Sequence, residues 1–150
     1  MDQAVHLGIT GIKEVAFEID ETIELPGATE VGINFEQSLN PNMEQSTVEL
    51  ILTVRLFKKS EPEKNFLRIK TSNIFFVQEL KNFATETVDE YNFPDILLAT
   101  ILGLSISHTR ALLAKCTLGT KFDGFFIPIV NPGEVAKQLF LTSINNTIEQ

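Results

Sequence analysis

The sequence is poor in the residue types that most often carry chemistry. Among its 150 residues are one cysteine, two histidines, one tyrosine and no tryptophan. The single Cys116 excludes an internal disulfide and a zinc site built from several cysteines. The chain also lacks a phosphate-binding glycine loop, a metal-ligand spacing and a pair of carboxylates within an apolar stretch. We therefore expect no enzyme activity, no metal and no cofactor.

Positive charge is scarce as well. Twelve lysines and arginines stand against twenty aspartates and glutamates, which gives a net charge of -8. This balance argues against nucleic acid and anionic lipid as partners, and it permits a basic or unfolded polypeptide. The N-terminus lacks the basic segment and the following apolar segment of a secretory signal. With one unpaired thiol, the chain is expected to be cytoplasmic.

No apolar run is long enough to span a bilayer. The longest, from Ile96 to Ile106, is well short of the ~20 residues that a hydrocarbon core requires, so we expect no membrane span. The run belongs to a predicted helix over residues 94–115, which would be roughly 33 Å long. His108 is its only ionisable residue between Asp95 and Arg110. Helices that are apolar nearly all round are buried on several sides.

One row of this helix consists of small side chains, which let another backbone come close. Its members are Ala99, Gly103, Ser107 and Ala111. We interpret the segment as a central helix that packs one face on its own sheet and another on a second subunit. An ordinary core helix in a monomer is the alternative.

Four segments before the helix alternate apolar and polar residues, which is the period of β-strands. They cover about residues 5–19, 31–39, 48–57 and 65–77. Because short loops join them, we predict an antiparallel meander. In the fourth strand the alternation is expected to change phase near Ser72 and Asn73. Residues 58–64 are predicted as a hairpin loop and residues 78–93 as a connector with some helix.

The chain after the central helix supplies a crossing segment and a second helix. Gly119 is placed to end the first helix, and residues 122–130 form an apolar extended stretch. Residues 131–134 combine a capping side chain, a proline and an acid, which predicts a helix to about residue 143. The expected fold class is therefore α+β: a four-stranded antiparallel sheet followed by one long central helix and a shorter C-terminal helix, in a single domain covering residues 1–150.

Alternation also predicts which charges share a face of the sheet. If Val15 and the apolar residues that follow it face the core, Glu14 and Glu18 face outward together. The same face is predicted to carry further charges: Asp20, Glu30, Glu36, Arg55, Arg68 and Lys70. A solvated surface is the simpler interpretation. The functional one is a salt-sensitive docking surface for a basic partner.

The few nucleophiles and bases do not form a catalytic set. Ser105 and Ser107 lie near His108 in the helix, but this spacing does not by itself build a relay. We interpret His108 as a buried structural residue and Cys116 as an inert packed thiol. A small α+β enzyme with a pocket between sheet and helix is the alternative, and it would require His108 or Asp95 to line a cavity.

Three short motifs occur in the same order as the predicted elements. Residues 12–18, IKEVAFE, run through a basic residue, an acid, an apolar residue, a small residue, phenylalanine and an acid. Residues 107–110, SHTR, end a helix segment in arginine, with Gly119 following, and residues 127–132, IPIVNP, form the crossing. In order and spacing these motifs resemble the SecB family of protein-export chaperones, and the resemblance spans essentially the whole chain.

The resemblance implies an assembly and an activity. A SecB-like chain is expected to form a homotetramer, a dimer of dimers with the long helices between the sheets. It is expected to act as an ATP-independent holdase that keeps precursor proteins unfolded and can pass them to the SecA export motor. Glu14 and Glu18 match the family positions that dock the basic, zinc-bearing tail of SecA.

The resemblance also gives the phenylalanines a role. The family has a long apolar groove for extended polypeptide beside the fourth strand and the crossing segment. Apolar surface binds unfolded chains with little sequence preference, because the hydrophobic effect is non-directional. For each phenylalanine a place in the core is the alternative. The candidates for the groove are Phe75, Phe76, Phe122, Phe125 and Phe126.

The sequence departs from the family pattern at three places. Ser72 and Asn73 stand where the family has Gly-Gly, and residues 68–70, RIK, replace an acidic partner nearby. His108 and Thr109 stand where the family has Pro-Tyr. These departures favour a divergent branch, such as the chaperones dedicated to an antitoxin, in which the groove is kept and the SecA contact is dispensable. The two kinds of chaperone share a mechanism and differ in client.

Overall fold

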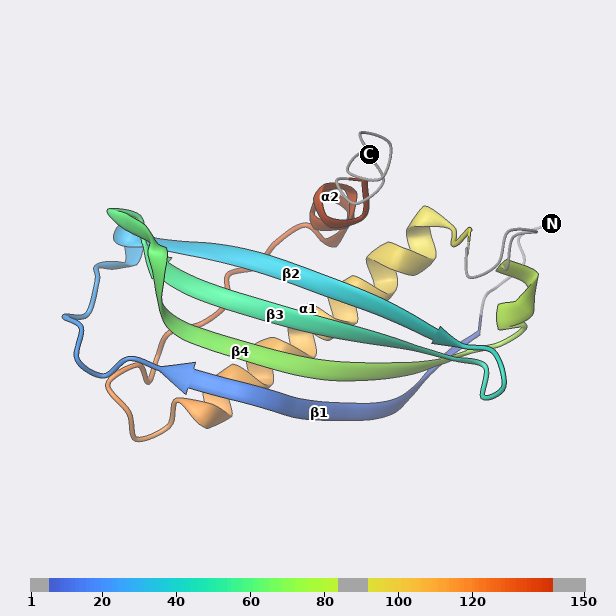
Figure 1. Cartoon of the computed structure of the whole chain (residues 1–150), viewed down its shortest axis with the longest axis horizontal. Helices are drawn as coiled ribbons and strands as arrows, with labels where there is room; N and C mark the ends of the chain where they lie inside the picture. The colour runs from blue at the N-terminus through green and yellow to red at the C-terminus, as the bar shows by residue number, and fades with distance from the viewer. Residues whose placement is uncertain (1–5, 84–91, 142–150) are drawn as a thin grey trace.

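The computed structural model describes residues 6–83 and 92–141. In it, a curved antiparallel sheet is crossed diagonally on one face by a long helix (Figure 1). The α+β fold class is thereby confirmed. The strands are β1 (Leu7–Ile19), β2 (Val31–Asn42), β3 (Thr47–Lys58) and β4 (Glu61–Val77), and the helices are α1 (Asp95–Cys116), α2 (Pro132–Ala136) and the π-helical turn η3 (Lys137–Leu141), with short 3-10 turns at Ala28–Glu30 and Leu80–Phe83.

The strand order is β1-β4-β3-β2, so the predicted meander is wrong for the first strand. Tight turns at residues 43–46 and 59–60 join β2, β3 and β4 as neighbours. The connection from β1 to β2 is longer, and Figure 1 shows it passing around the end of the sheet. β1 therefore pairs with β4 instead of β2. The second of those turns also replaces the longer loop expected at residues 58–64.

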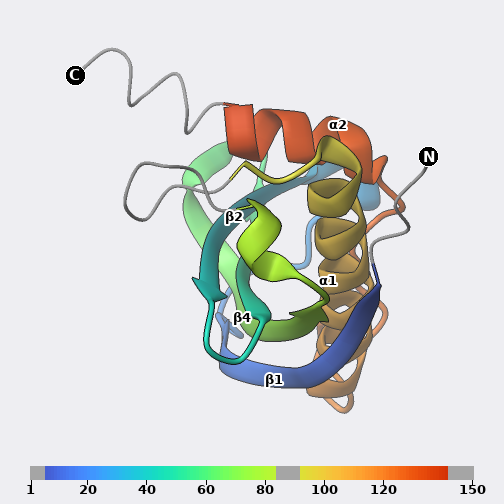
Figure 2. The same cartoon turned by 90° about the vertical axis from the view of Figure 1, so that its right-hand side faces the viewer.

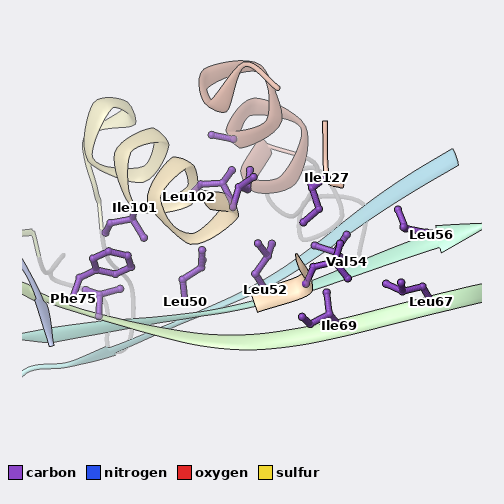
Figure 3. Packing of buried hydrophobic residues seen from close by; sticks show 14 of the residues in the cluster. Leu50, Leu52, Val54, Leu56, Leu67, Ile69, Phe75, Ile101, Leu102 and Ile127 are labelled. Atoms are coloured by element: carbon purple, nitrogen blue, oxygen red, sulfur yellow. The ribbon is translucent and has the colours of Figure 1, made fainter. Parts of the chain in front are cut away.

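The core lies between α1 and the face of the sheet that α1 covers, which we call the inner face. Figure 2 shows α1 and α2 on the same side of the curved sheet. β3 points five consecutive alternate residues inward, from Val48 to Leu56, and each is at most 2% exposed. Figure 3 shows how these side chains meet those of α1. Other members of this core are Leu67, Ile69, Phe75, Leu97, Ile101, Leu102, Ile106 and Leu113.

The alternation of β4 continues without a phase change, which corrects the expectation for Ser72 and Asn73. The register between β3 and β4 is regular from Thr47 to Leu56. Thr71 and Asn73 therefore stay on the inner face, where both are fully buried. Two polar residues thus occupy core positions, and their hydrogen-bond partners come from α1.

A β-bulge in β1 places Glu14 on the opposite side from the one expected, whereas Glu18 faces outward as predicted. The register shifts between Glu14 and Ala16, so the bulge falls at Val15. Val15 is 49% exposed, and the prediction that it faces the core is wrong. Glu14 pairs with Thr71 on the inner side, whereas Glu18 pairs with Arg68 on the outer face. The two glutamates do not share a face.

The ends of both helices follow their sequence signals. Gly119 adopts a positive φ of 77° just beyond α1. The side chain of Asn131 accepts hydrogen bonds from the backbone N–H groups of Gly133 and Glu134, at 2.9 and 3.2 Å. The predicted start of the second helix is therefore confirmed, while its predicted end near residue 143 lies outside the described residues.

By length and composition, α1 also qualifies as a helix that could cross a membrane, with a mean hydropathy of 1.6 over its most apolar window. Of that window 39% is buried, because α1 packs on the sheet. Core helices of globular proteins pass the same test. The expectation that the chain has no membrane span stays a prediction.

Candidate functional site

An apolar pocket opens between the edge strand β2 and the crossing segment, residues 122–131, which joins α1 to α2. Its volume is about 460 Å³, and we call it the edge pocket. Asp123 is the one charged residue in its wall. The lining consists of Pro26, Ala28, Val31, Ile33, Leu56, Asp123, Gly124, Phe125, Phe126 and Pro128.

Three aromatic rings anchor the start of the crossing segment. Phe122 is fully buried and stacks on Phe66, with ring centroids 5.6 Å apart and an interplanar angle of 15°. Phe125 meets both rings edge-on, at 6.0 and 5.9 Å. Because Phe125 also lines the edge pocket, this cluster connects the pocket wall to the core.

Only two of the five predicted groove phenylalanines lie at this pocket. Phe125 is half-buried, and Phe126 is 61% exposed. Phe75 and Phe122 are fully buried in the core. Phe76 is 40% exposed and pairs with Gly8 on the outer face, away from the edge pocket. Whether any of them contacts a client stays a prediction.

The rest of the crossing segment is anchored in the core at one residue and is otherwise more exposed. Ile127 is 1% exposed, whereas Ile129 is 95% exposed. Arg110 of α1 donates to the carbonyl oxygens of Ile127 and Pro128, from Nε at 2.8 Å and from Nη2 at 2.9 Å. The Lys121 ammonium donates to the carbonyl oxygen of Ile23, which ties the β1–β2 connection to the chain just before the crossing segment.

A second polar arrangement fixes α1 on the sheet. The Asn73 amide nitrogen donates to the carbonyl of Leu50 at 3.2 Å and to Thr71 Oγ1 at 3.0 Å. Its oxygen, 2.9 Å from His108 Nδ1, is therefore an acceptor, and His108 is the donor. Thr71 Oγ1 in turn lies 2.8 Å from Thr109 Oγ1.

These contacts agree with a structural role for His108. Its ring lies nearly parallel to that of Phe75, at 6.3 Å between centroids. Burial lowers the pKa of His108 below its ordinary value of 6.5. Neither His108 nor Asp95 lines the edge pocket, whereas Asp95 lines a separate pocket between α1 and α2. In the described part of the chain, no group of three or more histidine, cysteine, aspartate or glutamate side chains is placed to hold a metal ion.

Cys116 is an unreactive thiol. Its Sγ donates to Glu14 Oε2 at 3.2 Å. Burial first, and then the hydrogen bond and charge of Glu14, raise the pKa of Cys116 to about 11. The thiol therefore stays protonated near neutral pH.

The outer face carries mixed charge and is not an acidic surface. Arg68 Nη1 lies 3.5 Å from Glu18 Oε1, and Arg55 forms an ion pair with Glu36. Arg55 and Arg68 are direct cross-strand partners in the centre of the sheet. With Glu14 on the inner side, the proposed acidic docking surface loses one of its two main residues.

The row of small residues on α1 is divided between two environments. A Cβ added at Gly103 would lie 3.1 Å from Pro132 Cγ, so α2 of the same chain covers this position. Ala99 lines a second pocket of about 300 Å³ between α1 and α2. Ser107 and Ala111 are exposed. Their place in an oligomer interface stays a prediction.

Sequence reasoning missed most of the edge pocket. It placed residues 31–39 in an alternating strand, but it had no signal that the crossing segment lies opposite this strand. It also noted Arg110 only as part of a motif. Both walls of the pocket could be predicted from the sequence, as an apolar strand and as a long extended segment with prolines. The sequence did not indicate that the two lie side by side.

The comparisons with known proteins agree with this architecture. No family model matches the chain, and no curated protein matches it by sequence. Among solved structures, the fold is similar to that of Mycobacterium tuberculosis Rv1957, a SecB-like chaperone in complex with a ChAD peptide from the HigA1 antitoxin Rv1956. The TM-score is 0.50 at 11% sequence identity, over 83% of this chain and 90% of that chain. The resemblance to SecB-like proteins is thereby confirmed for the fold.

Proposed function

We propose that this chain, which has the fold of a SecB-like chaperone, holds unfolded polypeptide without ATP by taking its apolar side chains into the edge pocket. The observation that carries the proposal is the open apolar pocket with Phe126 exposed on its wall. Exposed apolar surface of this kind marks interaction sites. A peptide bound to the structurally similar Rv1957 supports a polypeptide client.

One pocket gives weak binding by itself. Burying an apolar side chain of the size of phenylalanine is worth about 1.5–3 kcal/mol, and about 460 Å³ holds only one or two such side chains. We therefore propose that clients bind in extended form across several copies of the chain, with a homotetramer as the assembly. Linked weak sites gain affinity because the second contact is intramolecular.

A precursor for export and an antitoxin are the two candidate clients. The hand-off to SecA receives less support from the geometry, because Glu14 and Glu18 lie on opposite faces of β1. An antitoxin-type client needs the pocket alone. We therefore favour a client that is held and released without a motor, and we keep the SecA hand-off as a prediction.

The test compares two phenylalanines of different location. Phe126→Ala is expected to weaken binding of a reduced, permanently unfolded protein about tenfold, because one apolar side chain leaves the pocket wall. Phe76→Ala removes an exposed ring from the outer face and is the matched control, with unchanged binding. Dissociation constants from fluorescence anisotropy without ATP decide the matter. Equal losses in both variants, or no binding by the wild type, would contradict the proposal.

A further inference from the structure

One side chain of α1 supplies hydrogen bonds to the backbone of the outer wall of the edge pocket, in addition to the apolar contacts of Phe125 and Ile127 with the core. Among the described residues, the backbone of residues 126–130 makes no hydrogen bond to another backbone group. Both of the side-chain hydrogen bonds that it accepts come from Arg110. An extended segment without backbone partners keeps its place only through its side chains and such contacts. Arg110 is therefore the polar attachment of this wall.

The guanidinium suits this attachment better than another cation would. Its planar fork places Nε and Nη2 toward two successive carbonyls, of Ile127 and Pro128. Hydrogen bonds with a charged donor are among the stronger ones in proteins. A lysine ammonium is a point charge on a flexible stem and does not reproduce the two-point geometry.

Contacts with the sheet fix the part of α1 that carries Arg110. The residue before it, Thr109, is fully buried and contacts Thr71 of the sheet through its hydroxyl. Thr109 also donates to the carbonyl of Ser105 at 2.7 Å, within α1. The position of α1 on the sheet thus determines where Arg110 holds the crossing segment.

The two carbonyls that accept hydrogen bonds from Arg110 lie between two exposed side chains, Phe126 and Ile129. Ile127 anchors the segment in the core, and its neighbour Phe126 borders the pocket. Gly124, with a φ of +95°, lies just before Phe125 in a conformation that side chains rarely adopt. Glycine adopts this conformation without strain, so the backbone turns here into the extended part of the crossing segment.

We infer that Arg110 is the positioning residue of the client site, which sets the distance between the crossing segment and β2 and so the width of the edge pocket. The inference rests on the proposed function. It requires no contact between Arg110 and the client. Loss of Arg110 is expected to weaken client binding although every apolar residue of the pocket remains.

The experiment uses three variants of the full chain. Arg110→Ala removes both hydrogen bonds and is expected to bind an unfolded client about tenfold more weakly. Arg110→Lys keeps the charge and the stem, and it is expected to bind nearly as weakly as Arg110→Ala. Lys115→Ala removes a positive charge from the exposed end of the same helix, and it is expected to bind like the wild type.

Two further measurements separate positioning from general stability. Chymotrypsin cleavage after Phe125 and Phe126 is expected to accelerate in Arg110→Ala, while the buried amides of β3 keep their protection from hydrogen exchange. Millimolar methylguanidinium, which replaces the lost group, is expected to restore part of the binding to Arg110→Ala and to leave the wild type unchanged. If Arg110→Ala does not fold, Arg110→Lys with the same readouts decides the question.

Failure of this inference is distinguishable from failure of the proposed function. Equal client binding and equal cleavage rates in the wild type and both Arg110 variants would overturn the role of Arg110 and leave the holdase proposal intact. A wild type that binds no unfolded client would overturn the holdase proposal. Accelerated cleavage in Arg110→Ala with unchanged client binding would show that Arg110 holds a segment that the client does not use, which also overturns the inference.

Discussion

Asn73 is a polar residue at a core position of a strand, and its surroundings explain why it is tolerated. Its amide makes three hydrogen bonds, to Leu50, Thr71 and His108, so no buried polar atom of its side chain is left without a partner. Burial of a polar network lowers the stability of the fold little only when every buried polar atom has a hydrogen-bond partner. The network also fixes the position of α1 along β4, because His108 must lie within hydrogen-bond distance of Asn73.

The buried position of Asn73 could not be predicted from the strand alone. Ser72 and Asn73 are two adjacent polar residues that interrupt the apolar alternation of the strand. We interpreted the interruption as a change in which residues face the core, and this prediction was wrong. The compensating partner, His108, lies 35 residues further along the chain. A local pattern contains no information on such a contact, whereas the apolar alternation of β3 was sufficient for its correct faces.

His108 gives the stability of the fold a defined dependence on pH. The unfolded chain takes up a proton near the ordinary pKa of 6.5, whereas burial lowers the pKa in the folded chain. The contribution of His108 to stability is therefore present above pH 6.5 and is lost as the pH falls through the folded pKa. Urea unfolding from pH 8 to pH 5 is expected to show a steeper loss in the wild type than in His108→Gln.

His6, which is exposed, supplies the control for this prediction. His6→Gln removes a histidine from the surface and is expected to keep the pH dependence of the wild type. Parallel pH profiles for the wild type and His108→Gln would show that the buried position of His108 has no energetic effect.

At the scale of elements, the bulge in β1 shows how one residue changes the composition of a surface. An extra residue at Val15 moves Glu14 to the inner side, where it accepts a hydrogen bond from Cys116. The alternation of residues 13–19 is regular in sequence and gives no sign of this bulge. Arg55 and Arg68, in contrast, were placed correctly on the outer face because β3 and β4 pair there without a bulge.

Packing between α1 and α2 depends on the absence of a side chain at Gly103. Pro132 Cγ and Cβ would lie 3.1 and 3.2 Å from an added Cβ, which is closer than ordinary contact. Gly103→Leu is therefore expected to displace α2 and to lower the free energy of unfolding by about 1–3 kcal/mol. Urea denaturation measures the difference.

Gly27 is the matched control, because an added Cβ there meets nothing within 4 Å and its φ is -64°. Gly27→Leu is expected to change the stability by less than about 0.5 kcal/mol. A loss of equal size in both variants would mean that α2 does not contribute to the stability through this contact.

At the scale of the whole molecule, apolar surface remains exposed on β1 and on α1. Ile9, Ile12 and Val15 are between 47 and 51% exposed, and Ile96 at the start of α1 is 76% exposed. β1 and α1 contact each other in the fold. The sequence predicted an apolar helix with a surface left over for a partner, because composition alone limits how much a chain of 150 residues can bury.

The order of the strands in the sheet could not be predicted correctly from the sequence. Neighbouring strands in sequence pair more often than distant ones, and that tendency led to the meander. The β1–β2 connection, residues 20–30, was interpreted as a short loop, whereas it passes around the end of the sheet to the opposite edge (Figure 1). The edge pocket follows from this order, since β2 is an edge strand only because β1 lies at the opposite side.

Association of copies through the exposed side of β1 and α1 is the last prediction. The wild type is expected to have a mass near four times 16.8 kDa by light scattering, because exposed apolar residues and small side chains favour a close contact between copies. Ala111→Lys, which places a charge on the exposed side of α1, is expected to lower the mass. Ser38→Lys, at an exposed outer-face position of β2, is expected to leave it unchanged. A wild type that stays monomeric at every concentration would contradict the assembly, and a tetramer unaffected by Ala111→Lys would place the interface on another surface.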